Sequence, residues 1–155
     1  MVTTVSAKTR SGTANRTYHR SLILVTCLGA ANRFVFVAKG DFPLHDGGLF
    51  YVMIRDLQQN SYRIPAFTSY NHDAIPFAYP PLAFYLAGLL NGLAGIPLTT
   101  ILRFLPYLVS LGCMAAFAAL AHALLPTRTA TVLATFVFAC APRAFNWIIM
   151  GGGLT

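Results

Sequence analysis

Charged side chains are scarce in this sequence. Only 10% of the 155 residues are Asp, Glu, Lys or Arg, whereas a soluble domain carries about a quarter, because its surface must meet water. Hydrophobic residues make up 56% of the chain, and the mean hydropathy is +0.61. This composition excludes an ordinary soluble domain and predicts a protein of the cell membrane, in contact with membrane lipid.

Acidic residues are scarcer still: there are four, against eleven basic residues, which gives a net charge of +7. The basic residues ahead of the first apolar segment are Lys8, Arg10, Arg16 and Arg20. The others are scattered singly, so no basic face with interleaved aromatic side chains can form, which excludes nucleic acid as a partner. A basic cluster before an apolar segment instead indicates a cytoplasmic N-terminus.

Cysteines are also few. Cys27, Cys113 and Cys140 all lie within apolar segments. Their odd number and their spacing predict neither a disulfide framework nor a metal site. We therefore expect buried thiols that act as small hydrophobic side chains.

The N-terminal residues 1–20 are polar, rich in Ser and Thr, and without apolar periodicity, which predicts a disordered cytoplasmic tail. Residues 21–155 then form the membrane domain. Its first span covers residues 21–38, which extend about 27 Å as a helix and just cross a bilayer core. A secretory signal peptide is the alternative, but apolar residues resume at 34–38, beyond any cleavage site, which favours an uncleaved span.

Further apolar segments follow the first span and predict an all-α, polytopic transmembrane helix bundle of about four spans. They cover residues 80–96, 99–125 and about 129–149. With the N-terminus inside, the loop of residues 39–79 lies on the extracytoplasmic face. The protein is thus expected to be multi-pass, with one extended outer loop.

The outer loop contains one amphipathic juxtamembrane helix, predicted over residues 47–60. Its apolar stripe has helical spacing and consists of Leu49, Phe50, Met53, Ile54 and Leu57. Such a helix lies flat on the membrane surface or packs on neighbouring spans. Asp46 stands directly before it, where we expect the carboxylate to cap free N–H groups.

All acidic residues fall inside the outer loop, as Asp41, Asp46, Asp56 and Asp73. A carboxylate at this surface suits the transfer of a group from a lipid-phosphate carrier, because it can deprotonate an acceptor hydroxyl or hold a metal ion. We expect Asp46 in this catalytic role, with Arg33 and Arg55 meeting the leaving phosphate. Arg33, late in the first span, has a second interpretation, in which it snorkels to the outer head groups.

Two His-Asp dipeptides, His45-Asp46 and His72-Asp73, offer nitrogen and oxygen ligands for a divalent ion. The close ligand spacing of a typical metal site is absent, so no metal ligand or cofactor is predicted, and a divalent metal ion is the alternative. His45, His72 and Asp73 are assigned as neighbours of a sugar or of that ion.

Three motifs in order carry a family resemblance: a first span with a late arginine, then HDGGLFYVMIRDL, then FAYPPLAFYL. Together they resemble the integral-membrane GT-C glycosyltransferases of the protein-mannosyltransferase and aminoarabinose-transferase type. In that family the first outer loop carries an acidic motif, usually Asp-Glu, and a juxtamembrane helix with Ala-Arg, and Lys-Pro-Pro-Leu opens the second span. Asp46 matches the first acid, Arg55 the helix arginine and Arg33 the arginine of the first span.

The resemblance implies a polyprenyl-phosphate sugar donor, an acceptor on the extracytoplasmic face, and Asp46 as general base or metal neighbour. Two positions depart from the family pattern. Gly47 replaces the second acid, which removes a carboxylate pair, and Tyr79 replaces the lysine, so a phosphate contact there loses its charge. Because family members are several times longer, we expect an N-terminal fragment that is inactive without the missing C-terminal portion of the same protein.

Two non-catalytic hypotheses stay open. A transporter or assembly-subunit fragment would gather polar residues inside the bundle at mid-membrane, whereas the transferase places them at the outer surface. A scaffold subunit would bind partner helices through small-residue faces, and Gly88 and Gly92 have the Gly-x-x-x-Gly spacing that suits close helix contact.

Overall fold

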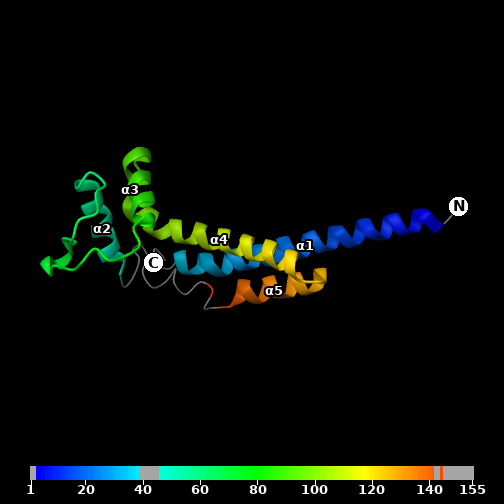
Figure 1. Ribbon diagram of the computed structural model, residues 1–155. Helices are drawn as coiled ribbons and strands as arrows, with labels where there is room; N and C mark the ends of the chain where they lie inside the picture. Colours follow the sequence, from blue (N-terminus) through cyan, green and yellow to red (C-terminus); the bar gives the residue numbers. More distant parts are fainter. Residues whose placement is uncertain (1–2, 39–45, 142–143, 145–155) are drawn as a thin grey trace. The chain divides into compact units, whose positions relative to one another are not determined.

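The protein is all-helical in the residues that its structure describes. The computed structural model describes residues 3–38, 46–141 and 144 (Figure 1). Its helices are α1 (Thr3–Ala38), α2 (Gly47–Gln59), α3 (Leu82–Ala94), α4 (Leu98–Leu124) and α5 (Arg128–Cys140), with a short 3-10 turn, η1 (Tyr70–His72). These ranges contain no β-strand, only an isolated bridge between Phe67 and Pro76. The all-α prediction is confirmed.

The described residues divide into two compact units. The three-helix unit contains residues 3–32 of α1, residues 111–124 of α4 and all of α5. The surface-helix unit contains residues 33–38, α2, η1, α3 and residues 98–110 of α4. Each unit has its own apolar core, which is built around Val25, Met114 and Ala139 in the first and around α2 in the second.

The first helix, α1, begins at Thr3, well before the predicted first span. It therefore includes residues 3–20, which the sequence predicts as a disordered tail. No proline occurs between Thr3 and Ala38 to end the helix, and each residue added to a formed helix gains one hydrogen bond. The predicted end of the first span, by contrast, agrees with the observed end of α1 at Ala38.

An arginine of α4 holds the C-terminal end of α1. Arg103 donates from Nε to the carbonyl oxygen of Val37 (2.8 Å) and from Nη2 to that of Ala38 (3.5 Å). The last carbonyls of a helix lack partners within the helix, and a cation beside them is also favoured by the helix dipole. This contact explains how a mostly apolar helix accommodates Arg103.

Among the helices that the structure describes, α4 alone is long and apolar enough to cross a membrane. The apolar helices α3 and α5 have 13 residues each, about 20 Å, against about 30 Å for a hydrocarbon core. Left-handed Gly95 (φ 67°) ends α3, and α5 ends ahead of Pro142, which disfavours helix in the residue before it. Residues 142, 143 and 145–149 of the predicted last span lie outside the described ranges, and the four-span bundle is not confirmed.

Large apolar side chains are exposed on α1, α3, α4 and α5. The most exposed on each helix are Ile23 (63%), Leu93 (84%), Leu124 (72%) and Val137 (64%). Only 17% of the apolar window of α4 is buried, unlike a core helix of a soluble protein. Such surfaces are rare on soluble monomers and suit contact with lipid. All three cysteines are free and exposed, so the prediction that they are buried is wrong.

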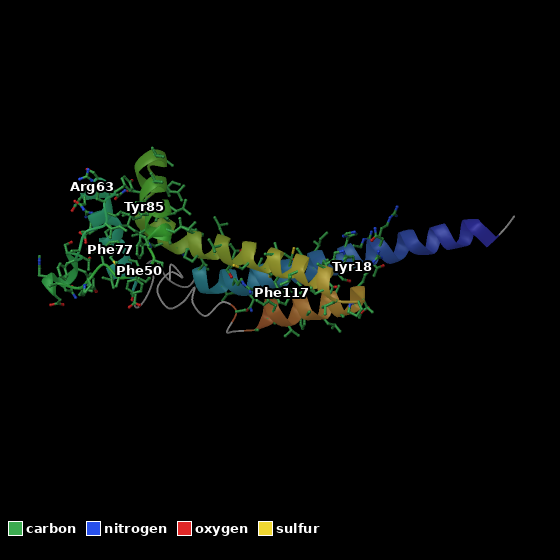
Figure 2. The ribbon with its side chains drawn as sticks, in the orientation of Figure 1. Tyr18, Phe50, Arg63, Phe77, Tyr85 and Phe117 are labelled. Atoms are coloured by element: carbon green, nitrogen blue, oxygen red, sulfur yellow. The ribbon has the colours of Figure 1, made fainter. Side chains whose placement is uncertain are left out.

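The apolar stripe of α2 forms the core of the surface-helix unit. The buried stripe residues are Phe50, Met53, Ile54 and Leu57. They pack in one cluster with residues of α3 and the start of α4, namely Phe84, Ala87, Leu98, Ile101 and Leu102. The aromatic side chains of Phe77 and Tyr85 border this cluster (Figure 2). The predicted helix of residues 47–60 is therefore confirmed to within one residue.

Gly88 allows α2 and α3 to approach closely. A Cβ atom at this position would lie 3.2 Å from Tyr62 Cε1 and 3.4 Å from Gln58 Cγ. The Gly88 carbonyl accepts hydrogen bonds from Gln58 Nε2 and Tyr62 Oη, both at 3.0 Å. Gln58 Nε2 also donates to Asn91 Oδ1 at 2.9 Å. The close helix contact expected from the glycine spacing is confirmed at Gly88.

Replacing Gly88 with alanine should loosen the packing of α2 on α3. The added methyl group would crowd the ring of Tyr62, which is held by its bond to the Gly88 carbonyl and must shift by a few tenths of an ångström; such overpacking costs about 1–3 kcal/mol. Gly112→Ala in α4 is the matched control, since nothing lies within 4 Å of a Cβ there and alanine favours a helix by about 1 kcal/mol. Thermal unfolding in detergent should show a lower midpoint for G88A and an unchanged or higher one for G112A. Equal midpoints for G88A and the wild type would contradict the close packing.

Candidate functional site

Asp46 occupies the N-cap position of α2, as predicted, but its side chain does not cap the helix. The residue is exposed, its backbone has φ −78° and ψ 0°, and its carboxylate makes no capping hydrogen bond. A capping side chain normally reaches the free N–H groups from an extended backbone conformation. The capping prediction is therefore wrong for the carboxylate, although the Asp46 carbonyl accepts the first helical bond from Phe50 N (2.9 Å).

Aromatic rings, rather than arginines, lie beside the first turn of α2. The ring of Tyr79 packs edge-on against Phe50, one turn after Asp46, with 5.2 Å between ring centroids. A Cβ at Gly48 would lie 3.6 Å from the ring and hydroxyl of Tyr70. Tyr79 therefore packs beside the first turn of α2, against the buried cluster that contains Phe50.

Arg33 is fully buried in the surface-helix unit, with 0% of its surface exposed. Its Nε donates to Ser110 Oγ of α4 at 3.0 Å. Both interpretations of Arg33, snorkelling to the head groups and binding a lipid phosphate, require an exposed guanidinium, and a side chain that is 0% exposed meets neither requirement. The partner of Arg33 comes from α4, which periodicity in the sequence could not indicate.

Arg55 is exposed and lies nine residues after Asp46 along α2. This spacing corresponds to about 13 Å along the axis and half a turn around it, so the two side chains leave opposite sides of the helix. Arg55 lines a cavity of ≈ 250 Å³ bounded by the α2, α3 and α4 residues Tyr51, Gln58, Asn91, Pro97, Leu98 and Thr99. The site predicted at Asp46 and the cation predicted for it are therefore separated.

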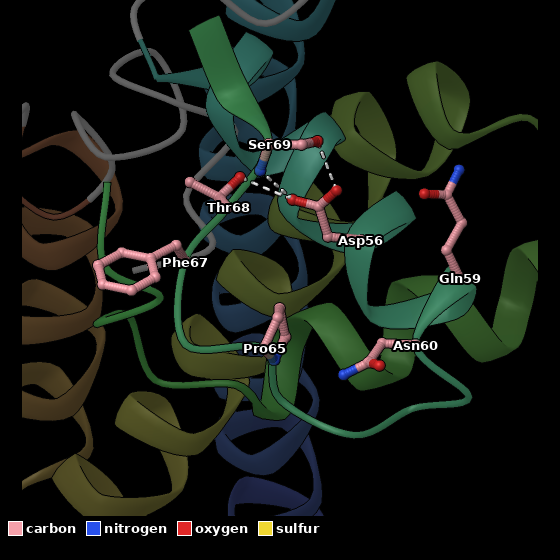
Figure 3. A pocket seen from close by; sticks show the side chains of 7 residues that line it. All are labelled: Asp56, Gln59, Asn60, Pro65, Phe67, Thr68 and Ser69. Carbon is pink, nitrogen blue, oxygen red and sulfur yellow. Dashed lines mark hydrogen bonds between the residues drawn. The ribbon is translucent and has the colours of Figure 1, made fainter. Parts of the chain in front are cut away.

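Asp56, which follows Arg55 in α2, faces a second cavity of ≈ 380 Å³ (Figure 3). The other residues that line this cavity are Gln59, Asn60, Pro65, Phe67, Thr68 and Ser69. Its carboxylate accepts hydrogen bonds from Thr68 Oγ1 (2.8 Å), Ser69 N (2.8 Å) and Ser69 Oγ (2.6 Å). These bonds tie the segment after α2 back onto the helix.

Opposing effects act on the pKa of the Asp56 carboxyl. Partial burial raises the pKa, whereas the hydrogen bonds from Ser69 and Thr68 and the positive charge of Arg55 lower it. The lowering effects prevail, so the carboxylate ionises more readily than an ordinary aspartate. A readily ionised carboxylate with three donors already in place is a weak general base, and Asp56 acts as a structural tie.

His72 and Asp73 are exposed in and directly after η1. The turn is tight, with left-handed backbone at Asn71 (φ 54°), His72 (φ 59°) and Ala74 (φ 50°). His45, the other histidine assigned to the site, lies outside the described residues. Within the described ranges, no group of three or more His, Cys, Asp or Glu side chains is placed to hold a metal ion.

Sequence reasoning gave no role to Asp56, Gln58 or Arg103, although their contacts shape the surface-helix unit. A helix of this amphipathic pattern places polar residues on one side but does not reveal what they bind. The partners of Asp56 come from an irregular segment without periodicity, so no sequence signal identifies them.

Comparisons with known proteins give no match: no protein-family model, no curated protein and no solved structure matches this chain.

Replacing Asp56 with alanine should release residues 61–79 from α2. The change removes three hydrogen bonds to a charged, partly exposed acceptor, worth about 1–2 kcal/mol together. Limited trypsin digestion should then cut faster after Arg63 in D56A. D73A, which removes an exposed acid of the same segment, should behave like the wild type. Equal cutting of D56A and the wild type would contradict the tie.

The contribution of Asp56 to stability should depend on pH. Because folding lowers its pKa, the stabilisation is fully present above the ordinary aspartate pKa of about 3.9 and is lost as the pH falls through the lower, folded value. The difference in unfolding midpoint between the wild type and D56A should therefore be largest at neutral pH and shrink below about pH 4. A difference that stays constant down to acidic pH would show that the charge of Asp56 is not involved.

Proposed function

We propose that this chain is part of a multi-pass membrane glycosyltransferase of the GT-C type. In this proposal the enzyme takes a sugar from a polyprenyl-phosphate donor and transfers it to an acceptor on the extracytoplasmic face. The exposed apolar faces of α1, α3, α4 and α5 support a membrane location for the helices. The order of the outer-loop motifs supports the family, and α2 supplies the surface helix that such an enzyme needs.

The observation that carries the proposal is the position of Arg55. A polyprenyl-phosphate ligand needs a cation for its phosphate next to an apolar surface for its chain. Arg55 is exposed at a cavity that lies between α2, the end of α3 and the start of α4. Tyr51, Asn91 and Thr99 offer further polar groups there. Apolar side chains such as Leu93 are exposed on α3, so both parts of the ligand find a matching surface.

Asp46 serves as the general base in this proposal, at the opposite end of α2 from Arg55. The distance of about 13 Å along the helix is too long for both side chains to contact one sugar-phosphate bond in this arrangement. Asp46 therefore acts on the acceptor side, and Arg55 holds the phosphate of the donor.

Arg55→Gln should weaken the binding of polyprenyl phosphate roughly tenfold, because it removes a charge-assisted contact. Arg63→Gln is the matched control, since Arg63 is also exposed and the variant loses the same charge. Native mass spectrometry in detergent would compare polyprenyl phosphate with polyprenol, which lacks the phosphate. If R55Q and R63Q bind the phosphate alike, or if the wild type binds polyprenol equally well, the proposed donor site is wrong.

Asp46→Asn should reduce sugar transfer in membranes that contain the protein, by about a hundredfold or more if the carboxylate is a general base. Asp73→Asn, a second exposed acid of the outer loop, should retain transfer. Expression of both variants would be compared by immunoblot. Transfer at the wild-type rate in D46N would remove Asp46 from the mechanism without affecting the donor site at Arg55.

A second candidate function, a transporter, is favoured by one observation. The buried Arg33 bonds to Ser110, which is near the middle of the 27-residue α4. Ionisable side chains inside membrane helices often mark a path for a substrate or ion. The transferase needs Arg55 for the phosphate ligand, whereas the transporter needs Arg33. Binding lost in R55Q and kept in R33Q supports the transferase, and the reverse supports a path through the bundle.

A further inference from the structure

The three-helix unit has a cavity of its own, with several polar side chains in its mainly apolar wall. It has a volume of ≈ 430 Å³ and is lined by the α1 residues Thr17, Tyr18 and Ser21 and the α5 residues Arg128, Thr129 and Val132. Four of these side chains carry a hydroxyl and one carries a guanidinium. A cavity lined in this way offers hydrogen-bond donors and one full positive charge to a ligand.

Two contacts fix the cationic side of this cavity. Tyr18 is 8% exposed, and its hydroxyl shares a hydrogen bond of 2.9 Å with His122 Nδ1 of α4. The guanidinium carbon of Arg128 lies 5.5 Å from the centroid of the Tyr18 ring, within range of a cation–π interaction. The ring is therefore held by α4 and in turn positions Arg128, so the charge sits at a defined place on the cavity wall.

The three-helix unit contains no acidic side chain that could neutralise Arg128. All four acidic residues of the chain lie between positions 41 and 73, in the other unit. Arg16 and Arg20 of α1 add further positive charge close in sequence to the cavity residues. No carboxylate of this unit therefore competes with a ligand for Arg128.

We propose that this cavity binds a phosphate group, as the head group of an anionic membrane lipid or as free phosphate. The Arg128 guanidinium pairs with phosphate oxygens, and the hydroxyls of Ser21, Thr17 and Thr129 donate to the remaining ones. The basic residues ahead of the apolar part of α1 mark this part as cytoplasmic, and anionic lipid head groups gather on that face. The inference does not depend on the transferase proposal.

The test is lipid binding by the purified full chain in detergent, measured by native mass spectrometry with phosphatidylglycerol, phosphatidylcholine or inorganic phosphate. Arg128→Gln should weaken phosphatidylglycerol binding roughly tenfold, while R63Q, which removes the same charge in the other unit, should not. Preference for phosphatidylglycerol over phosphatidylcholine that R128Q abolishes identifies a lipid head group. Binding of inorganic phosphate with the same dependence on Arg128 identifies free phosphate.

Both of those outcomes support the proposed phosphate site. The proposal is overturned if R128Q binds phosphatidylglycerol and inorganic phosphate as well as the wild type does. Ser21→Ala and Thr129→Val test the hydroxyls without changing the charge and should each weaken binding by a few-fold. These two variants decide the matter if circular dichroism shows that R128Q does not fold. Their binding at the wild-type level would then count against the proposal.

Discussion

The surface-helix unit depends on one backbone carbonyl, that of Gly88. It accepts hydrogen bonds from both Gln58 and Tyr62, and a side chain at residue 88 would crowd these two donors, with its Cβ 3.2 Å from the Tyr62 ring. Because Gly88 lies inside α3, its carbonyl also belongs to the helical ladder, and the two side-chain bonds are additional to it. The apolar stripe of α2 supplies most of the burial at this contact, and the two hydrogen bonds select the register in which the stripe lies.

The opposite side of α2 is fixed by charge rather than by apolar contact. The Asp56 carboxylate holds Thr68 and Ser69. Partial burial raises the pKa of Asp56, but these hydrogen bonds, and to a smaller extent the charge of Arg55, lower it by more. With both sides of α2 engaged, the helix has little freedom to rotate. The direction of Arg55 is therefore a consequence of the packing, and the helical pitch places Asp46 on the other side of the helix.

Sequence patterns predicted the parts of this architecture that depend on local periodicity. The bounds and buried face of α2 follow from its apolar spacing, and the contact at Gly88 follows from the small-residue pattern. The partners of Arg33 and Arg103 could not be predicted, because Ser110 and Val37 lie 77 and 66 residues away in the chain. The grouping of Arg33, Arg55 and Asp46 was expected from chemistry alone, whereas Arg33 is buried and the helical pitch of α2 separates Arg55 from Asp46.

The most direct test of this account is whether α2 docks on α3 in a membrane. Cysteines placed at Gln58 and Asn91, whose side chains are 2.9 Å apart, would be treated with a short thiol cross-linker in intact membranes, after replacement of the native cysteines. The Tyr62 bond to Gly88 and the apolar stripe remain in this variant. Efficient cross-linking of the 58/91 pair, but not of a 59/91 pair, is the predicted result. Equal cross-linking of the two pairs, or none in either, would contradict the docked arrangement.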